Sequence, residues 1–165
     1  MIKVNIIDNL GKKTRELSDK EAEKISKLIR STNLKENKDS TYTEEEIKYL
    51  TESRTPEMVK KRTKEGFVVF LTNEDDEVVG CGMVVHWKDH YEGKYLRVRD
   101  DYRKQGLGRQ ICELREKKLK ELGVKEVYIQ SLKFENTINF NKKRGFVETG
   151  EKTPKNLAII MKKKL

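Results

Sequence analysis

The feature that most constrains the fold is an unbroken succession of strand, glycine turn, helix and strand in residues 94–131. Residues 94–99 (KYLRVR) and 125–131 (KEVYIQS) have the pattern of strands. Between them, apolar side chains recur at helical spacing over residues 107–122, a pattern typical of an amphipathic helix that ends at Gly123. A crossover helix allows the two flanking strands to pair in parallel, so we predict a βαβ unit.

The residues before this unit predict a hairpin. Residues 67–72 and 78–87 are largely apolar, as in buried strands, and the acidic turn 73–77 joins them. Gly93 marks a further turn, after which the strand at 94–99 begins. Shorter strands are expected at residues 4–7, 146–150 and 157–165. Together these segments predict a central mixed sheet of about six or seven strands.

Capping signals predict helices in the first 65 residues and one near the end of the chain. The signals are Ser18 or Asp19 before 21–32, a capping box of Thr43 and Glu46 before 44–53, Thr55 with Pro56 before a short helix that Gly66 ends, and 138–143 before Gly145. Residues 33–42 have the composition of a polar linker. We therefore expect one mixed α/β domain over residues 1–165, with a mainly helical region in 1–65 and the sheet-bearing core in 67–165.

Charge and composition narrow the class of protein. The 165 residues include 37 Lys and Arg against 28 Asp and Glu, and the net charge of +9 favours nucleic acid, acidic lipids or phosphorylated small molecules as partners. The basic residues are spread over many predicted helices without a nucleic-acid motif, so nucleic acid ranks last. No apolar run approaches the roughly 18 residues of a membrane span, and the start lacks the apolar segment of a signal peptide. We expect a cytoplasmic protein that does not bind membranes.

Cysteine and histidine give no sign of a metal site. Cys81 and Cys112 lie too far apart for a CxxC motif or a disulfide framework, so we expect two reduced, buried thiols. The stretch HWKDH, with His86 and His90, resembles HExxH only superficially, because it has no glutamate and lies between two strands. These histidines are interpreted as part of a surface loop, with recognition of an acceptor molecule as the alternative.

The glycine turn before the predicted helix carries the main functional signal. The first turn of a helix has unpaired N–H groups and a partial positive charge, and Gly106 and Gly108 would let an anion approach the backbone closely. The alternative is a tight turn without a ligand. The P-loop pattern GxxxxGK[ST] is absent, and the dinucleotide-binding pattern GxGxxG fails because Ile111 occupies its third glycine position.

The wider sequence around this turn resembles the GNAT family of N-acetyltransferases. The family fingerprint [QR]-x-x-G-x-[GA] matches RKQGLG, and its V-x-P-E-Y-R run matches VRDDYR with Asp100 in place of proline. The segment NFNKKRGF looks like the family's later x-F-Y-x-K-x-G-F segment, and LAIIMKKKL like its last strand. The matching residues include Val98, Arg103, Gly106, Gly108, Gly145 and Phe146. The resemblance covers residues 67–165 and implies the GNAT fold.

The resemblance implies that acetyl-CoA is the co-substrate and that no metal is needed. In the family, two neighbouring parallel strands splay apart, and the pantetheine arm pairs with the backbone near Val98, whose N–H polarises the thioester carbonyl. Backbone N–H groups at the helix start would hold the pyrophosphate, with added charge from Arg103 and Lys104. Asn136 lies close to, but not at, the position of the family's pantetheine-binding asparagine. The implied cofactor-binding residues are Val98, Arg103, Lys104, Gln105, Gly106, Leu107, Gly108, Arg109 and Asn136.

The resemblance supplies the catalytic residues unevenly. The acid in many relatives is the tyrosine of the F-Y-x-K-x-G-F segment, where this chain has Asn141, and an amide is no useful proton donor at neutral pH. Either Tyr128 or water then protonates the leaving thiolate, or the thiolate leaves unassisted. Glu92 stands six residues before Val98, where protein-acetylating relatives carry a catalytic glutamate, and the alternative is a solvated turn residue.

The leading hypothesis is an acetyl-CoA-dependent N-acetyltransferase, in which a primary amine of a small molecule, protein or peptide attacks the thioester in a ternary complex. Because of Asn141, a non-catalytic acyl-CoA-binding or regulatory module is the alternative. A basic nucleic-acid-binding protein ranks third. The identity of the amine, the length of the acyl group and the formation of a homodimer stay open.

Overall fold

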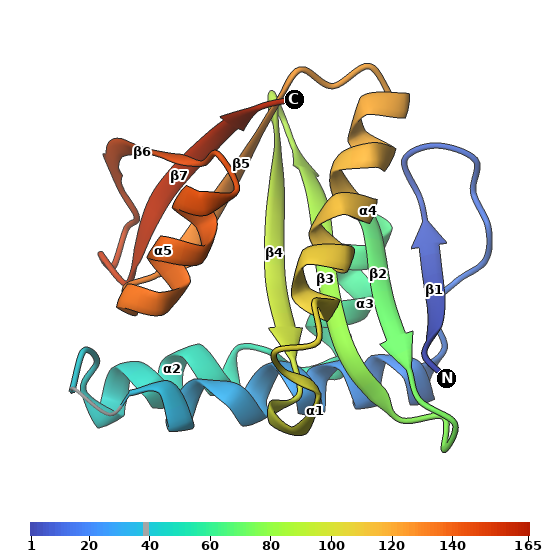
Figure 1. The fold of residues 1–165 in the computed structure, drawn as a ribbon, viewed down its shortest axis with the longest axis horizontal. Helices are drawn as coiled ribbons and strands as arrows, with labels where there is room; N and C mark the ends of the chain where they lie inside the picture. The colour runs from blue at the N-terminus through green and yellow to red at the C-terminus, as the bar shows by residue number, and fades with distance from the viewer. Residues whose placement is uncertain (38–39) are drawn as a thin grey trace.

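The computed structural model describes residues 1–37 and 40–165. In this part of the chain seven strands form one sheet in the order β1-β2-β3-β4-β5-β7-β6 (Figure 1). The strands are β1 (Lys3–Asp8), β2 (Gly66–Thr72), β3 (Val78–Trp87), β4 (His90–Val98), β5 (Glu126–Leu132), β6 (Val147–Lys152) and β7 (Ala158–Lys164). The helices are α1 (Asp19–Glu36), α2 (Glu44–Glu52), α3 (Pro56–Lys64), α4 (Leu107–Glu121) and α5 (Glu135–Lys143), with a short 3-10 helix at Asp100–Tyr102. The predicted mixed α/β fold is confirmed.

The sheet is antiparallel at every pairing except the one between β4 and β5. These two strands run parallel and α4 connects them, so the predicted βαβ unit is confirmed. Because β4 and β5 are neighbours in the middle of the sheet, the turn before α4 lies at the end of a central strand, beside its parallel partner.

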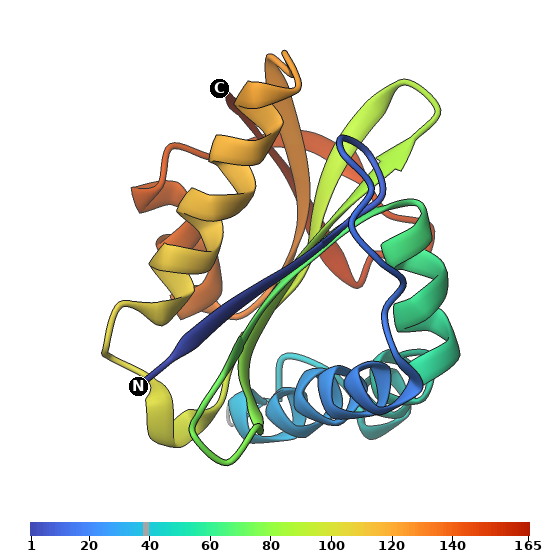
Figure 2. The same cartoon turned by 90° about the vertical axis from the view of Figure 1, so that its right-hand side faces the viewer.

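Helices cover both faces of the sheet. α4 and α5 lie on one face, and α1 and α3 lie on the other, where α2 packs against α1 (Figure 2). Side chains of β2 alternate between two hydrophobic clusters, as expected for a strand buried on both faces. Val68 and Phe70 join the cluster under α1 and α3, whereas Phe67 and Val69 join the cluster under α4.

The start of β4 differs from the prediction. The sequence predicted a turn around Gly93 and a strand from residue 94, but the hairpin turn is residues 88–89 and β4 begins at His90. Gly93 lies inside the strand, where a Cβ would lie 3.1 Å from Nη1 of Arg115 and 3.2 Å from Cγ2 of Ile129. The glycine therefore makes room for neighbours on α4 and β5 and does not form a turn.

The helices before β2 largely follow their capping signals. Ser18 caps α1, and the predicted capping box of Thr43 and Glu46 is present at α2. The prediction that residues 33–42 form a linker is wrong in its first part, because α1 continues to Glu36. Residues 38–39 of that linker lie outside the described residues.

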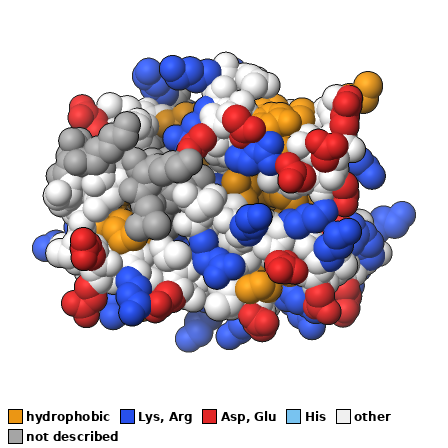
Figure 3. Space-filling view, turned by 90° about the horizontal axis from the view of Figure 1, so that it is seen from below, with side chains coloured by type: hydrophobic (Ala, Val, Ile, Leu, Met, Phe, Trp, Pro, Cys, Tyr) orange, Lys and Arg blue, Asp and Glu red, His pale blue; other side chains and the backbone are white. Residues whose placement is uncertain are grey.

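The described surface mixes both signs of charge. On the face seen from below, which includes α1, Lys and Arg side chains alternate with Asp and Glu (Figure 3). Apart from the atoms drawn in grey, this face carries no purely basic patch. Over residues 1–37 and 40–165, no helix is long and apolar enough to cross a lipid bilayer.

Candidate functional site

β4 and β5 separate soon after they pair. Their register consists of Glu92 opposite Tyr128 and Gly93 opposite Ile129, and the strands then diverge toward the end of the sheet near α1 (Figure 1). A bulge marks the divergence, because Tyr95 and Leu96 of β4 together oppose a single residue of β3. Tyr95 has φ +55°, a conformation uncommon for a residue with a side chain. Together the bulge and the short register leave an opening in the middle of the sheet.

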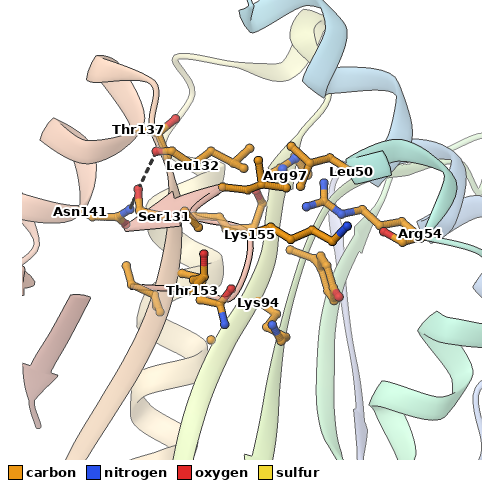
Figure 4. Close-up of a pocket in the computed structure, with 18 of the residues that line it drawn as sticks. Leu50, Arg54, Lys94, Arg97, Ser131, Leu132, Thr137, Asn141, Thr153 and Lys155 are labelled. Carbon is orange, nitrogen blue, oxygen red and sulfur yellow. Dashed lines mark hydrogen bonds between the residues drawn. The ribbon is translucent and has the colours of Figure 1, made fainter. Parts of the chain in front are cut away.

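A cavity of about 360 Å³ occupies this opening (Figure 4). Its walls come from β4, β5, α2 and the loop after it, α5, one residue of α4, and the loop between β6 and β7 with the first residue of β7. Residues from helices on both faces of the sheet line the cavity, so it reaches from one face toward the other. A ligand in the cavity would contact both faces of the sheet.

One edge of the opening offers backbone groups to a ligand. Arg99 donates its N–H to the carbonyl of Val79 on β3 at 2.8 Å. Since N–H groups alternate in direction along a strand, the N–H of Val98 points away from β3, into the opening. Within the described residues, β4 has no register with β5 beyond Gly93. An extended ligand could therefore add to β4 as a strand would.

The glycine turn lies beside the end of β4. Gly106, with φ +78°, precedes the first residue of α4, and the helical bonding begins with the N–H of Gln110 donated to Gly106 O at 3.0 Å. The N–H groups of Leu107, Gly108 and Arg109 belong to the first turn, which no side chain caps. A Cβ at Gly108 would lie 3.6 Å from Cγ2 of Val98 and 3.9 Å from the Phe140 ring. The turn thus opens between β4 and α5.

The charged residues predicted around this turn vary in their contacts. Arg103 Nε lies 3.3 Å from Oδ1 of Asp100, the residue that replaces the proline of the family pattern. Arg109 Nε lies 2.8 Å from Glu113 Oε1. Lys104 and Gln105 are exposed on the loop. Asn136 is exposed in the first turn of α5. Acidic side chains therefore already partner the two arginines.

Glu92 is buried in β4, so its interpretation as a solvated turn residue is wrong. The side chain is 5% exposed, with Oε1 2.8 Å from Nζ of Lys94 and Oε2 3.7 Å from Nε2 of His90. Because Lys94 lines the cavity, it connects the Glu92 carboxylate to that space.

Tyr128 lies in a hollow next to the cavity, together with Glu92 and His90. Its ring lies 5.2 Å from the ring of His90, and it is not among the residues that line the cavity. A hydrogen bond with Glu126 raises the pKa of Tyr128 above its ordinary value. A higher pKa makes this phenol a weaker acid.

Asn141, the residue at the family's tyrosine position, lines the cavity and is buried. Its Nδ2 donates to Oγ of Ser131 at 3.3 Å, and the two residues lie next to each other in Figure 4. Ser131 lies on β5 and also lines the cavity, although nothing in the sequence pattern singled it out. The pair presents an amide and a hydroxyl where a tyrosine hydroxyl was expected.

The sequence prediction also missed the charge of the cavity. The basic residues that line it are Arg54, Lys94, Arg97, Arg115 and Lys155. None of the described lining residues is Asp or Glu. Burial, together with the positive charge of Arg97, lowers the pKa of Arg54 to about 10, so this guanidinium is still charged at neutral pH. These residues come from α4, β4 and two separate loops, so no short motif contains them.

The remaining candidates have structural roles. His86 stacks on Tyr91 with ring centroids 4.2 Å apart, and it lies on β3 and not in a loop. Cys81 and Cys112 are buried and free, as predicted, and burial raises the pKa of the Cys81 thiol to about 12. Across the described ranges, no three His, Cys, Asp or Glu side chains gather closely enough to hold a metal ion.

Comparison with known proteins gives a family match and many similar folds. Residues 25–146 match the model of the acetyltransferase (GNAT) family. A search of curated protein sequences gave no match. The fold is similar to that of PaiA N-acetyltransferase from Thermoplasma acidophilum in complex with coenzyme A, with 20% identity, 99% of each chain covered and a TM-score of 0.74.

Two further solved structures have similar folds. A GNAT-family acetyltransferase described as putative, from Desulfovibrio desulfuricans, has 16% identity over 98% of this chain and 99% of that chain, with a TM-score of 0.70. A GNAT acetyltransferase from Elizabethkingia anophelis, with acetyl-CoA bound, has 19% identity over 66% of this chain and 82% of that chain, with a TM-score of 0.54. At these identities the likeness shows the fold.

Proposed function

Because the chain belongs to the GNAT acetyltransferase family, we propose that it transfers an acetyl group from acetyl-CoA to a primary amine. The observation that carries this proposal is the opening between β4 and β5, with an uncapped glycine turn at its mouth. The similar structures from Thermoplasma acidophilum and Elizabethkingia anophelis hold coenzyme A and acetyl-CoA, respectively, which supports the same co-substrate here.

The backbone would hold most of the co-substrate. In this proposal the N–H groups of Leu107, Gly108 and Arg109 bind the pyrophosphate, because a helix start attracts anions. Lys104 and Gln105 lie on the exposed loop just before this turn and would add contacts. The pantetheine arm would then pair with the open edge of β4, where the N–H of Val98 points into the opening. We propose that Arg103, in the loop before this turn, and Asn136, in the first turn of α5, contact the outer part of coenzyme A.

The reaction requires one bond to form and one to break. The amine nitrogen bonds to the thioester carbon, the carbon–sulfur bond breaks, and the products are an N-acetylated amine and coenzyme A. The amine loses one proton, and we propose that Glu92 accepts it through water, since its carboxylate contacts cavity-lining Lys94. Asn141 supplies no acid, so water is the proposed donor to the thiolate, with Tyr128 as the second candidate.

The first prediction tests the co-substrate site. We expect millimolar acetyl-CoA to raise the melting temperature of the purified protein by several degrees, because a ligand that binds only the folded state stabilises it. In Gly108→Trp the rise should vanish, since an indole there would fill the space between Val98 and Phe140. Thermal unfolding with and without acetyl-CoA measures both effects.

The matched control is Lys117→Trp, which places the same side chain on an exposed position of the same helix. It should keep the full response to acetyl-CoA. Absence of any shift in the native protein would refute the co-substrate site. A shift that Gly108→Trp retains would move the site away from the glycine turn.

A further inference from the structure

The cavity has a cationic wall on the face of the sheet opposite α4. Three residues form it: Arg54 after the end of α2, Arg97 on β4, and Lys155 in the loop between β6 and β7. Their side chains converge on the same space (Figure 4). We call these three residues the basic wall. They come from three segments far apart in the sequence, so the fold creates this concentration of charge.

Arg54 is the central member of the basic wall. Its side chain is 9% exposed, and its Nη1 is buried without a hydrogen-bond partner. The guanidinium lies over the Tyr95 ring, 5.3 Å from the centroid, and no described carboxylate lies within ion-pair distance of it. A buried cation whose donor lacks an acceptor is unfavourable unless a ligand completes its contacts. Arg54 therefore points to an anionic group in the cavity.

The neighbours of Arg54 also favour an anionic group in the cavity. Burial lowers the pKa of Arg54, and the nearby positive charge of Arg97 lowers it further. Nζ of Lys155 lies 4.2 Å from the centroid of the Tyr49 ring, and no described carboxylate pairs with it. Of the other two lining cations, Lys94 already has Glu92, and Arg115 donates to the carbonyl of Met83 at 3.2 Å. An anion on the basic wall would pair with Arg54 and Lys155, for which no described carboxylate is a partner.

Bound coenzyme A would not contact the basic wall with its phosphates, so the wall would be available to a second molecule. Its phosphates would bind at the start of α4, and residues 103–109 do not line the cavity. The basic wall faces the side of α1 and α2 instead. The anion must therefore belong to the acceptor.

We propose that the acceptor is a small amine that also carries a carboxylate or phosphate group, which Arg54, Arg97 and Lys155 bind. This inference rests on the proposed function and names the substrate class for the same site. The anionic group on the wall would leave the amine free to face the bulge of β4. Polyamines would be rejected, because the basic wall repels them and no described lining residue is acidic.

The experiment uses pairs of amines that differ only in the anion. Rates of coenzyme A release from acetyl-CoA are measured with L-amino acids against their C-terminal amides, O-phosphoethanolamine against ethanolamine, and spermidine. We expect the anionic member of a pair to have at least about tenfold higher kcat/KM, the effect of one charge-assisted hydrogen bond. Comparison of the amino acids with O-phosphoethanolamine shows whether the basic wall prefers a carboxylate or a phosphate.

Substitutions in the basic wall then test whether its residues cause the preference for anionic amines. Arg54→Met should raise KM for the anionic amine about tenfold or more and leave its neutral counterpart unchanged. Lys155→Met, in the exposed loop, should have a smaller effect in the same direction. Lys48→Met removes an exposed cation of α2 that does not line the cavity, and should change neither value.

Equal or faster acetylation of the amides or of spermidine would overturn this inference and leave the proposed function standing. Failure of acetyl-CoA to shift the melting temperature would instead refute the proposed function.

If no amine is turned over, or if Arg54→Met does not fold, a binding measurement replaces the kinetic test of the basic wall. N-acetyl-L-glutamate and N-acetyl-L-glutamate diamide are then compared by thermal shift with coenzyme A present, in the native protein and in Lys155→Met. Stabilisation by the acid alone, weakened in Lys155→Met, supports the wall, and equal responses overturn it.

Discussion

Glu92 is buried, and its carboxylate contacts Lys94, which lines the cavity. Its proposed role as the base can be tested by replacing the carboxylate with an amide. Gln has nearly the same shape but cannot accept a proton, so Glu92→Gln should lower kcat about 100-fold if the carboxylate is the base. The measurement is kcat at saturating acetyl-CoA, with retention of the acetyl-CoA melting shift as the test of folding.

Glu116→Gln is the matched control, because Glu116 is also ion-paired, with Arg144 and Lys163, but lines neither the cavity nor the hollow. It should leave kcat unchanged. A Glu92→Gln enzyme with native kcat would show that water alone removes the proton and that the ion pair with Lys94 has a structural role.

The sequence revealed the backbone part of the site but not its side chains. Gly106 and Gly108 stand out because glycines at a helix start leave its N–H groups open to an anion. Arg54 and Ser131 carry no such signal, because an isolated arginine or serine has the same appearance on a surface as in a cavity. Their role depends on the bulge at Tyr95, and a tyrosine with positive φ follows no sequence rule.

At the scale of the elements, the contact between β2 and β3 depends on Gly66. A Cβ at Gly66 would lie 1.8 Å from the carbonyl oxygen of Val84, and backbone cannot move aside as a side chain can. Gly66→Ala should therefore reduce the free energy of unfolding by more than about 3 kcal/mol, measured by urea denaturation. At Gly80 a Cβ would lie 3.0 Å from the end of the Ile111 side chain and 3.4 Å from the end of the Leu71 side chain, with the nearest backbone atom 3.6 Å away, so Gly80→Ala should cost about 1 kcal/mol. Equal losses would refute the backbone clash.

Periodicity predicted the elements well, while Gly93 misled one boundary. The strand 78–87 and the capping box at Thr43 have strong local signals, and both are present. Gly66 was interpreted as a helix end, and α3 ends two residues before it, whereas Gly93 was interpreted as a turn but lies inside β4. Each makes room for an atom of a distant segment, a cause that local sequence does not contain. The splay of β4 and β5 likewise depends on packing between segments, so only the family resemblance indicated it.

At the scale of the whole molecule, ion pairs that join distant segments make the fold sensitive to acid. Asp8 of β1 is buried, with Oδ2 2.7 Å from Nζ of Lys118 on α4. Burial raises the pKa of Asp8, but Lys118 and the backbone N–H groups of Leu10 and Gly11 lower it more, so the net pKa is below its ordinary value. The chain already carries +9 at neutral pH, and protonation of such carboxylates adds to its self-repulsion.

The start of α1 gives the sharpest test of this acid sensitivity. The guanidinium of Arg15 donates to both carboxylate oxygens of Glu21, at 2.8 and 2.6 Å, and the N–H of Ser18 donates to the same carboxylate at 2.9 Å. These contacts lower the pKa of Glu21 from 4.5 to about 2, with the Arg15 hydrogen bonds as the largest favourable cause. The folded-state pKa is the lower one, so the stabilisation is complete above pH 4.5 and is lost as the pH falls toward 2.

Glu21→Gln should therefore lower the free energy of unfolding by about 1 kcal/mol at pH 7, since it weakens the capping box and removes a partly exposed ion pair. The difference between variant and native protein should shrink toward zero as the pH falls to about 2, where the native carboxylate also becomes protonated. Urea denaturation at a series of pH values measures this difference. Glu23→Gln, at an exposed position of the same helix, should show no such convergence. A Glu21→Gln difference that stays constant with pH would mean that the carboxylate's charge contributes nothing and that the loss comes from the altered cap geometry.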